Sequence, residues 1–336
     1  GLAAWRLGDC DKAAEAFQRS AAASTNPNLT AAAHYWASRA LIRCRFPEKS
    51  DEQLRGAARF PETLYGMLAH EQLGRDLPET HAQPDLTEAD WRRLRDEDAV
   101  QQAVMLAEIG RRDEAADDLV WLVRTGDPDD YPALSRLARA LGLTGAQTFM
   151  AYNAPRGEGA HPSLRYPVTF RTPVGGWRVD PALAFAHALQ ESNFRERVVS
   201  PAGAIGLMQI MPITQREYAA SINMSSNADL KDPAVNLAFG QRTLESLSTA
   251  GYTQGRLPKI MAAYNAGPSP VARWESEIRD AGDPLLYMES IPYWETRGYV
   301  AVVMRNYWMY LRQADAPAPS RIDLAENDWP QFPKVR

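Results

Sequence analysis

The segment from Asp180 to Pro212 carries the residues best suited to chemistry. Asp180 followed by Pro181 is typical of a helix start, and apolar residues then recur at helical spacing as far as Leu189. Glu191 comes directly behind this apolar run. Because desolvation disfavours a charged carboxylate, we expect Glu191 to hold a proton near neutral pH and to serve as a general acid. The alternative is a solvated glutamate at a helix end, since most glutamates are exposed.

Four short blocks, in order along the chain, carry a resemblance to a known family. They are Glu191-Ser192, the stretch S-P-A-G-A-I-G-L-M-Q-I-M-P from Ser200 to Pro212, A-Y-N-A-G from Ala263 to Gly267, and E-S-I-P-Y-W-E-T-R-G-Y-V from Glu289 to Val300. In order and approximate spacing they resemble the soluble lytic transglycosylases, which are bacterial cell-wall enzymes with a lysozyme-like domain. The close resemblance runs from about Tyr166 to Leu311.

The resemblance implies a mechanism that needs a single carboxyl group. In the family, a glutamate protonates the glycosidic oxygen between N-acetylmuramic acid and N-acetylglucosamine. The same group then removes the proton from the muramic acid's 6-hydroxyl, which closes onto C1 and leaves a 1,6-anhydro end. A nucleophile tethered to the substrate has an effective concentration that free water lacks. Glu191 would be the acid and then the base. A route through the substrate's acetamide remains open.

The resemblance also implies a set of substrate-binding residues. These are Ser200, Met208, Gln209, Met211, Tyr264, Asn265, Glu289 and Tyr299. Simpler structural roles exist for several of them: Ser200 before a proline could form a turn, and Asn265 could cap a helix. For one of the two methionines, Met208 or Met211, an ordinary place in the core explains the residue as well as contact with substrate does.

A second catalytic carboxylate is not evident in the sequence. Glycoside hydrolases normally place two carboxyl groups roughly 5–5.5 Å apart for retention or roughly 6.5–9.5 Å apart for inversion. Glu196 is interpreted as a solvated loop charge, and Glu295 as half of a structural ion pair. Glu289 is interpreted as an auxiliary group that neighbouring aromatic side chains keep charged and hydrogen-bonded. Those neighbours are Tyr287, Tyr293 and Trp294.

His187 departs from the family pattern, which usually has an aliphatic residue there. It lies four residues before Glu191, so the two side chains could touch and His187 could tune the acid. A metal pair lacks a third ligand. We expect His187 to face a neighbouring helix, and we expect neither a metal nor a cofactor.

The elements that position these residues are predicted to be helices throughout, so the expected fold class is all-α. Residues 1–80 form tetratricopeptide-like helical hairpins in this interpretation, residues 85–155 a helical linker domain, residues 165–315 the lysozyme-like catalytic domain and residues 316–336 an extended tail. Because every chemical motif lies beyond Tyr166, we expect the N-terminal helices to affect substrate handling and not bond chemistry.

The two cysteines, Cys10 and Cys44, lie 34 residues apart, which matches the period of a tetratricopeptide repeat. They are therefore expected at equivalent places on successive hairpins. Stacked helices lie about 8–10 Å apart, beyond ordinary disulfide reach. We expect two unpaired, partly buried thiols.

The composition excludes several classes of protein. The chain has 336 residues, a net charge of −5 and no long basic run, which argues against nucleic acid as a partner. No apolar stretch is long enough to span a membrane. No signal peptide is visible, and because Gly1 is not a natural start we expect the leader to be missing from this chain. The resemblance implies a periplasmic location.

The leading hypothesis is therefore a peptidoglycan lytic transglycosylase that acts on glycan strands. A hydrolytic muramidase acting on the same bond is the first alternative. The second is a non-catalytic peptidoglycan-binding scaffold whose N-terminal helices recruit a protein partner, although a pure binder does not require a buried acid at position 191. Product mass separates the two enzymes, because the anhydro product is one water lighter.

Overall fold

A computed structural model describes residues 1–78, 84–156, 159–168 and 171–333. Over these ranges the chain is helical and contains no strand, only isolated backbone bridges such as that between Ile205 and Ile210. The all-α prediction is confirmed. The chain forms two compact units, each assembled from separate segments. The first unit comprises residues 1–79, 250–312 and 316–332, and the second comprises residues 80–249, 313–315 and 333–336.

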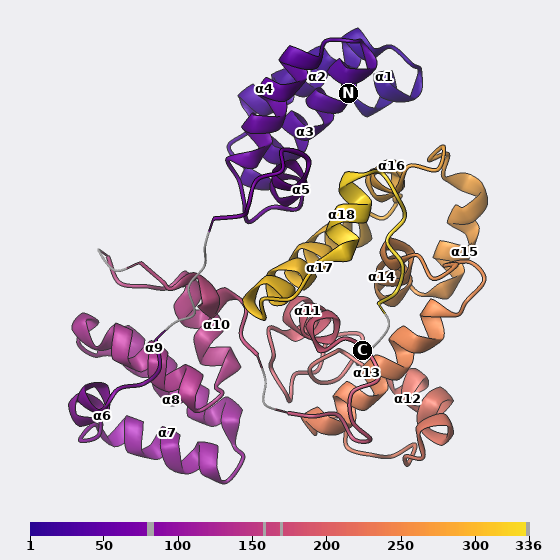
Figure 1. Cartoon of the computed structure of the whole chain (residues 1–336). Helices are drawn as coiled ribbons and strands as arrows, with labels where there is room; N and C mark the ends of the chain where they lie inside the picture. Colours follow the sequence, from indigo (N-terminus) through magenta and orange to yellow (C-terminus); the bar gives the residue numbers. More distant parts are fainter. Residues whose placement is uncertain (79–83, 157–158, 169–170, 334–336) are drawn as a thin grey trace. The chain divides into compact units, whose positions relative to one another are not determined.

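The first unit begins with an array of five helices. They are α1 (Leu2–Arg6), α2 (Cys10–Ala23), α3 (Pro27–Arg43), α4 (Pro47–Ala58) and α5 (Leu64–Gln72). Consecutive helices pack side by side, α2 on α3 and α3 on α4 (Figure 1). Buried alanines such as Ala13, Ala31 and Ala37 let the helix backbones approach closely. Asn26 caps α3, and Thr63 caps α5, by accepting backbone N–H groups on their side-chain oxygens.

The remaining helices of the first unit come from the C-terminal third of the chain. They are α14 (Leu257–Ala266), α15 (Pro268–Glu277), α16 (Pro284–Ser290), α17 (Trp294–Gln313) and α18 (Pro319–Ala325). Proline in the first turn starts four of these helices, where its missing N–H costs no hydrogen bond. α17 supplies much of the core, including the fully buried Trp308. α18 packs against α5.

The expectation of an extended tail over residues 316–336 is wrong for its central part. Residues 319–325 form α18, and Leu324 is fully buried. Trp308 Nε1 donates to the buried Ser320 Oγ at 2.9 Å, and Arg321 Nε donates to Glu71 Oε2 at 2.7 Å. The prolines that suggested an extended segment instead include Pro319, which begins the helix.

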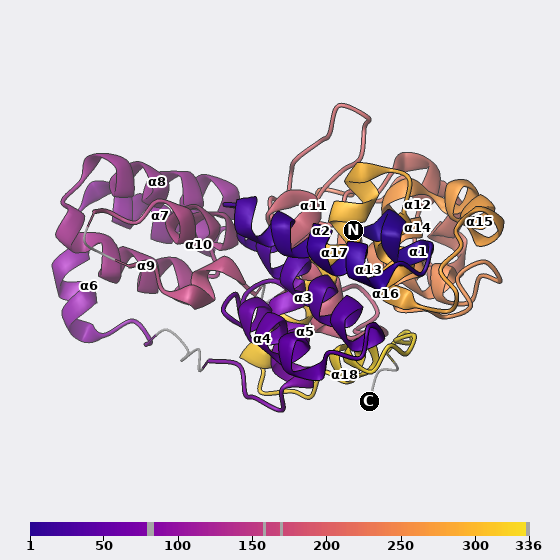
Figure 2. The same ribbon diagram turned by 90° about the horizontal axis from the view of Figure 1, so that it is seen from above.

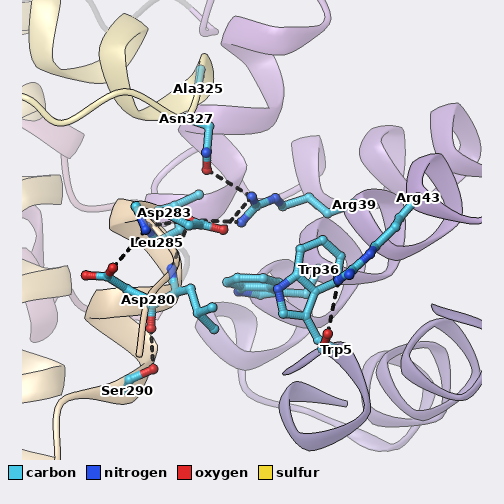
Figure 3. A network of polar contacts seen from close by, with 12 residues as sticks. Trp5, Trp36, Arg39, Arg43, Asp280, Asp283, Leu285, Ser290, Ala325 and Asn327 are labelled. Atoms are coloured by element: carbon cyan, nitrogen blue, oxygen red, sulfur yellow. Dashed lines mark hydrogen bonds and ion pairs between the residues drawn. The ribbon is translucent and has the colours of Figure 1, made fainter. Parts of the chain in front are cut away.

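Arg39 connects three parts of the first unit (Figure 3). Its Nη2 donates to Asp283 Oδ2 at 2.7 Å and to Asn327 Oδ1 at 2.9 Å, and its guanidinium lies 4.6 Å from the centroid of the Trp36 ring. Arg39 therefore joins three segments that are distant in the sequence, near positions 39, 283 and 327. By compactness, the N-terminal helices group with residues 250–312 and 316–332. The division of the chain into consecutive functional domains stays a prediction.

The second unit begins with another helical array. It contains α6 (Glu88–Leu94), α7 (Asp98–Glu108), α8 (Arg112–Thr125), α9 (Tyr131–Ala140) and α10 (Thr144–Tyr152). α8 packs against both α7 and α10 (Figure 2). Thr87 and Asp90 form a reciprocal capping box at the start of α6. Arg136 of α9 binds both carboxylate oxygens of Asp90, which fixes α6 against α9.

The second unit contains three further helices; the first motif block ends the first of them, and the second block lies in the loop that follows it. The helices are α11 (Pro181–Ser192), α12 (Pro212–Tyr218) and α13 (Pro233–Ser248). Asp180 caps α11 as expected, and Asp232 caps α13 in the same way, each by accepting a backbone N–H two residues on. Among the described residues, no helix has both the length and the apolar character needed to cross a bilayer.

The expectation of two free thiols is wrong, because Cys10 and Cys44 form a disulfide. Cys10 is the first residue of α2, and Cys44 directly follows the last residue of α3. These helices are consecutive and antiparallel, so the start of one lies beside the end of the other, with the two Cα atoms 5.6 Å apart. The expected separation referred to helix axes, but residues on facing sides of paired helices lie closer than the axes do.

Replacement of both cysteines by serine should destabilise the N-terminal helices. The bond joins two residues that lie 34 apart in the sequence. A cross-link of this span lowers the entropy of the unfolded chain and so stabilises the folded state by about 2–4 kcal/mol. Urea unfolding of the double variant, followed by tryptophan fluorescence, should show this loss. Reducing agent should shift the wild-type transition in the same direction and leave the variant unchanged. Equal stability of the two proteins under oxidising conditions would contradict the prediction.

Candidate active site

Glu191 is the second-last residue of α11 and is half-buried. The helix beneath it is almost entirely buried, through residues such as Leu183, Ala186 and Leu189. The chain leaves the helix through Asn193, whose φ of 51° is left-handed, a conformation that asparagine tolerates better than most residues. Glu191 is therefore held at the end of a rigid element, immediately before the chain reverses.

Ser192, the second residue of the E-S block, links α11 to the loop of the second motif block. It is buried, and its Oγ contacts the Leu207 carbonyl oxygen as donor at 2.8 Å. The Ala188 carbonyl lies 3.2 Å from the same hydroxyl. A hydroxyl at this position thus couples the placement of Glu191 to the placement of the neighbouring loop.

The loop from Ser200 to Pro212 folds back on itself through backbone hydrogen bonds. Ile205 and Ile210 exchange both of their N–H···O bonds at 3.0 Å. Ser200 Oγ accepts the N–H of Ala204 at 3.0 Å, so this serine forms a turn, as its alternative interpretation proposed. Gln209 is half-buried, and its Nε2 donates to the Gly206 carbonyl at 2.8 Å. Contacts of Ser200 and Gln209 with substrate stay predictions.

Asn236 of α13 fixes this loop, and the sequence reasoning missed it. Its Oδ1 accepts the N–H of Met208, while its Nδ2 donates to the carbonyls of Ile205 and Leu230, all at 2.8 Å. Gly206 has a φ of 75°, and a Cβ there would lie 2.4 Å from Asn236 Nδ2. An asparagine inside the apolar stretch before L-A-F was the available signal, since buried amides are normally fully hydrogen-bonded.

The two methionines of the loop have different environments. Met208 is fully buried, and a Cβ added to Gly240 of α13 would lie 2.1 Å from its sulfur. The predicted contact of Met208 with substrate does not fit this burial, and its role is to pack the loop onto α13. Met211 is half-buried at the start of α12 and stays a candidate.

The third and fourth motif blocks belong to the first unit. Tyr264 and Asn265 lie in the last turn of α14 and are half-buried. Thr296 of α17, itself buried, donates its hydroxyl to Asn265 Oδ1 at 2.6 Å. This bond orients the Asn265 amide, so the side chain serves here and not as the helix cap that was its alternative role. Tyr299 is almost fully buried in α17, and its predicted contact with substrate stays a prediction.

Glu289 lies on α16, and its hydrogen-bond partner comes from the N-terminal helices. Tyr65 Oη donates to Glu289 Oε1 at 2.5 Å. Burial raises the pKa of Glu289, while the Tyr65 hydrogen bond and the charge of Arg297 act in the opposite direction.

The three aromatic side chains that were expected to bind Glu289 either pack against other rings or are exposed to solvent. Tyr287 packs against Trp329, and Tyr293 packs edge-on against Trp274. Trp294 is 82% exposed. The expectation that these three rings supply the hydrogen bond to Glu289 is therefore wrong, because the hydroxyl comes from Tyr65.

Glu196 was interpreted as a solvated loop charge, and this is wrong. It is half-buried in the second unit near Asp113 of α8. Burial, followed by the negative charge of Asp113, raises its pKa. Glu295 is exposed, while Arg297 donates to the Ile291 carbonyl from Nε and from Nη2, at 3.1 and 2.8 Å.

His187 is fully buried one turn before Glu191. Burial alone lowers its pKa to about 3, so the ring is neutral at physiological pH. A positive charge on His187 therefore does not act on Glu191 near neutral pH. Within the described ranges, the group of potential metal ligands is Cys10, Asp11 and Cys44, and both sulfurs are already joined in the disulfide.

Comparison with known proteins identifies the segment that carries the first three motif blocks. Residues 170–285 match the family model described as the transglycosylase SLT domain. This segment is an SLT domain. It contains Glu191 and the loop of the second block, and it extends through α14 and α15 to the start of α16.

The SLT domain is homologous to murein transglycosylases. The chain is 36% identical over 168 residues to the soluble lytic murein transglycosylase of Escherichia coli K12, which covers 48% of this chain and 25% of that protein. It is 30% identical over 129 residues to the endo-type membrane-bound lytic murein transglycosylase A of Klebsiella pneumoniae, covering 35% of this chain and 64% of that protein. The match thus spans about a quarter of the length of the soluble relative.

Solved structures extend the likeness beyond the SLT domain. The 70 kDa soluble lytic transglycosylase of Escherichia coli matches with a TM-score of 0.75 and 22% identity, over 97% of this chain and 52% of that chain. An inactive glutamate-to-glutamine variant of lytic transglycosylase Slt from Pseudomonas aeruginosa matches with a TM-score of 0.72 and 25% identity, over 98% and 53%. The chain therefore has the all-α fold of these enzymes and spans about half of their length.

Replacement of His187 by leucine should flatten the acid dependence of stability. An unfolded histidine titrates near pH 6.5, whereas folded His187 titrates near 3, so below pH 6.5 only the unfolded state takes up this proton. Wild-type stability should then fall as the pH drops from about 6.5 towards 3, with His187 contributing about 2 kcal/mol of that loss by pH 5. Urea unfolding at pH 8, 7 and 5 measures it. Parallel pH dependences of the two proteins would refute the assignment.

Replacement of Asn236 by alanine should loosen the loop of the SLT domain. The change leaves one buried N–H and two buried carbonyls without their side-chain partner, and each such group costs about 1–3 kcal/mol if it stays unsatisfied. We expect a loss of about 3 kcal/mol in unfolding free energy and faster amide exchange at Met208. Asn227→Ala, at an exposed position in the connection before α13, is the matched control and should be near neutral.

Proposed function

We propose that this chain is a peptidoglycan lytic transglycosylase that cleaves the MurNAc-β-1,4-GlcNAc bond and leaves 1,6-anhydro-MurNAc ends. The observation that carries the proposal is the placement of Glu191, at the end of the buried helix α11 and coupled through Ser192 to the motif loop of an SLT domain. The homology of that domain to murein transglycosylases supports the same substrate class.

In the proposed reaction Glu191 acts twice. Its carboxyl group donates a proton to the glycosidic oxygen while the bond from that oxygen to C1 of the muramic acid breaks. The 6-hydroxyl oxygen of the same sugar then bonds to C1, and its proton returns to the Glu191 carboxylate. No water is consumed, and the enzyme ends in its starting protonation state. Because the nucleophile belongs to the substrate, no second catalytic carboxylate is required.

The surroundings of the other acidic side chains agree with this single-carboxylate chemistry. Glu196 is half-buried beside the negative charge of Asp113 of α8, and Glu289 accepts a hydrogen bond from Tyr65. We assign substrate contacts to the half-buried residues of the motif blocks. These are Ser200, Gln209, Met211, Tyr264, Asn265 and Glu289. Met208 and Tyr299 are assigned packing roles because both are buried.

We also propose that the protein works in the periplasm. Its proposed substrate is a cell-wall polymer. The Cys10–Cys44 disulfide supports an oxidising compartment, since such bonds persist in the bacterial periplasm and are rare in the cytosol. The N-terminal helices are a candidate surface for a protein partner.

Replacement of Glu191 by glutamine should abolish turnover while the fold is retained. The amide is nearly isosteric but can neither give nor reclaim the proton, and general acid–base catalysis is typically worth about 10²–10⁴-fold. The assay is mass spectrometry of muropeptides released from purified sacculi, in which wild-type products should be one water lighter than hydrolysed ones.

The matched control is Glu196→Gln, which removes another partly buried carboxyl group of the same unit. It should keep most of the wild-type activity. Hydrolysed ends from the wild-type protein would indicate a muramidase instead. Binding of sacculi without any cleavage would indicate a scaffold. More than a tenth of wild-type activity in a folded Glu191→Gln protein would remove Glu191 from the mechanism.

A further inference from the structure

Helix α16, which carries Glu289, is held at both ends by the N-terminal helices. At its start, Asp283 caps the helix through the N–H groups of Leu285 and Leu286, and the same carboxylate receives Nη2 of Arg39 from α3 at 2.7 Å. At its end, Arg6 of α1 donates a hydrogen bond to Ser290 Oγ. The helix has only seven residues, so these two contacts restrict its position and its rotation.

Between these ends, a chain of hydrogen bonds leads from the N-terminal helices to Glu289. Trp36 Nε1 of α3 lies 3.1 Å from Tyr65 Oη of α5, and Tyr65 Oη lies 2.5 Å from Glu289 Oε1. An indole nitrogen can only donate, so the Trp36 proton points at the tyrosine oxygen. The Tyr65 hydroxyl hydrogen is then directed at Glu289. An ionised carboxylate can only accept, so Tyr65 is the donor to Glu289 while its oxygen accepts the indole proton.

The donors have little freedom to move. Trp36 is 2% and Tyr65 5% exposed, and the Tyr65 ring packs on the Tyr35 ring at a centroid distance of 5.2 Å. A donor locked by packing fixes the orientation of its acceptor at little cost in conformational entropy. It also favours the ionised form of the acceptor, against the effect of burial. The other charged group facing Glu289 is Arg297 of α17, which acts in the same direction.

We propose that Tyr65 is a positioning residue for Glu289, and that the N-terminal helices thereby take part in the proposed transglycosylase reaction. The inference rests on the proposed function and on the assignment of Glu289 to substrate contact. It differs from the expectation that the N-terminal helices, over residues 1 to about 150, affect substrate handling and not bond chemistry. Removal of residues 1–79 would expose α16 and release Glu289 from its donor.

The test uses Tyr65→Phe in the full chain, with Tyr35→Phe as matched control. Both variants delete one buried phenolic hydroxyl from neighbouring rings, but only Tyr65 contacts Glu289. With glutamate ¹³C-labelled at the side-chain carboxyl, the Glu289 resonance is identified by its absence in Glu289→Gln and is titrated with pH. Tyr65→Phe should raise the pKa of Glu289 by about one unit or more, the effect of losing a hydrogen bond to a charged group. Tyr35→Phe should leave it unchanged.

Kinetics give a second readout. On soluble glycan strands, Tyr65→Phe should lower kcat about tenfold and move the acidic limb of the pH profile upward, with little change in KM. In the Glu289→Gln background the same substitution should have no further effect, because Tyr65 acts through Glu289. Equal losses in both backgrounds would reduce Tyr65 to a structural residue and overturn the proposal.

The outcomes separate this proposal from the proposed function. If the wild-type protein releases no anhydro products, the transglycosylase assignment fails, while the carboxyl titration still decides whether Tyr65 controls Glu289. An unshifted Glu289 in Tyr65→Phe overturns the proposal whatever the activity. If Tyr65→Phe does not fold, Trp36→Phe removes the indole donor while keeping an aromatic ring at that position, and should raise the pKa of Glu289 by a smaller amount; no shift there overturns the proposal.

Discussion

The pairing of Arg39 with Asp283 is the interaction on which the first unit depends. Both side chains are largely removed from water, with 17% and 11% of their side-chain surfaces exposed. Removing one partner of such a pair leaves an uncompensated buried charge, which is far costlier than losing a surface ion pair. Asp283 also caps α16, so one carboxylate serves both the helix start and the contact between distant segments. The same carboxylate therefore fixes both the packing of the N-terminal helices and the position of α16.

The SLT domain uses a related device around Glu191. Side chains with short, rigid stems bind backbone groups of the motif loop: Ser192 from α11 and Asn236 from α13. Such bonds fix the backbone and not merely a rotamer, so the loop's geometry follows from the packing of two helices. Gly206 completes the arrangement, since any side chain there would collide with the amide of Asn236. Ser192 and Asn236, which are not among the proposed substrate contacts, thus determine where the loop and its candidate residues lie.

Local features of the fold were predictable from sequence, whereas contacts between distant segments were not. Asp180-Pro181 and Asp232-Pro233 mark helix starts because capping and proline preference act within one turn. The Cys10–Cys44 bond was missed because its geometry depends on how two helices pair, which the spacing of 34 residues does not reveal.

The candidate site follows the same division. Glu191 could be singled out from its place behind an apolar run, but the burial of Met208 depends on a glycine 32 residues later in α13, and the partner of Glu289 lies 224 residues earlier in the sequence. Glu196 lacked any local sign of its burial, since the neighbouring charge comes from Asp113 of another helix. A side chain whose role depends on its own place in a helix could be predicted from the sequence. A side chain whose environment depends on a residue far away in the sequence could not.

The discontinuous make-up of the first unit has a consequence for the order in which the protein acquires structure. Residues 1–79 are made before residues 250–332, which complete the interior of the same unit. A growing chain must therefore carry an unfinished helical array, in which Arg39 lacks Asp283 and Tyr65 lacks Glu289, until almost all of this sequence has been synthesised. Contacts so distant in sequence close slowly. The Cys10–Cys44 bond joins two helices that are both synthesised early, so it can keep these helices aligned until residues 250–332 have been made.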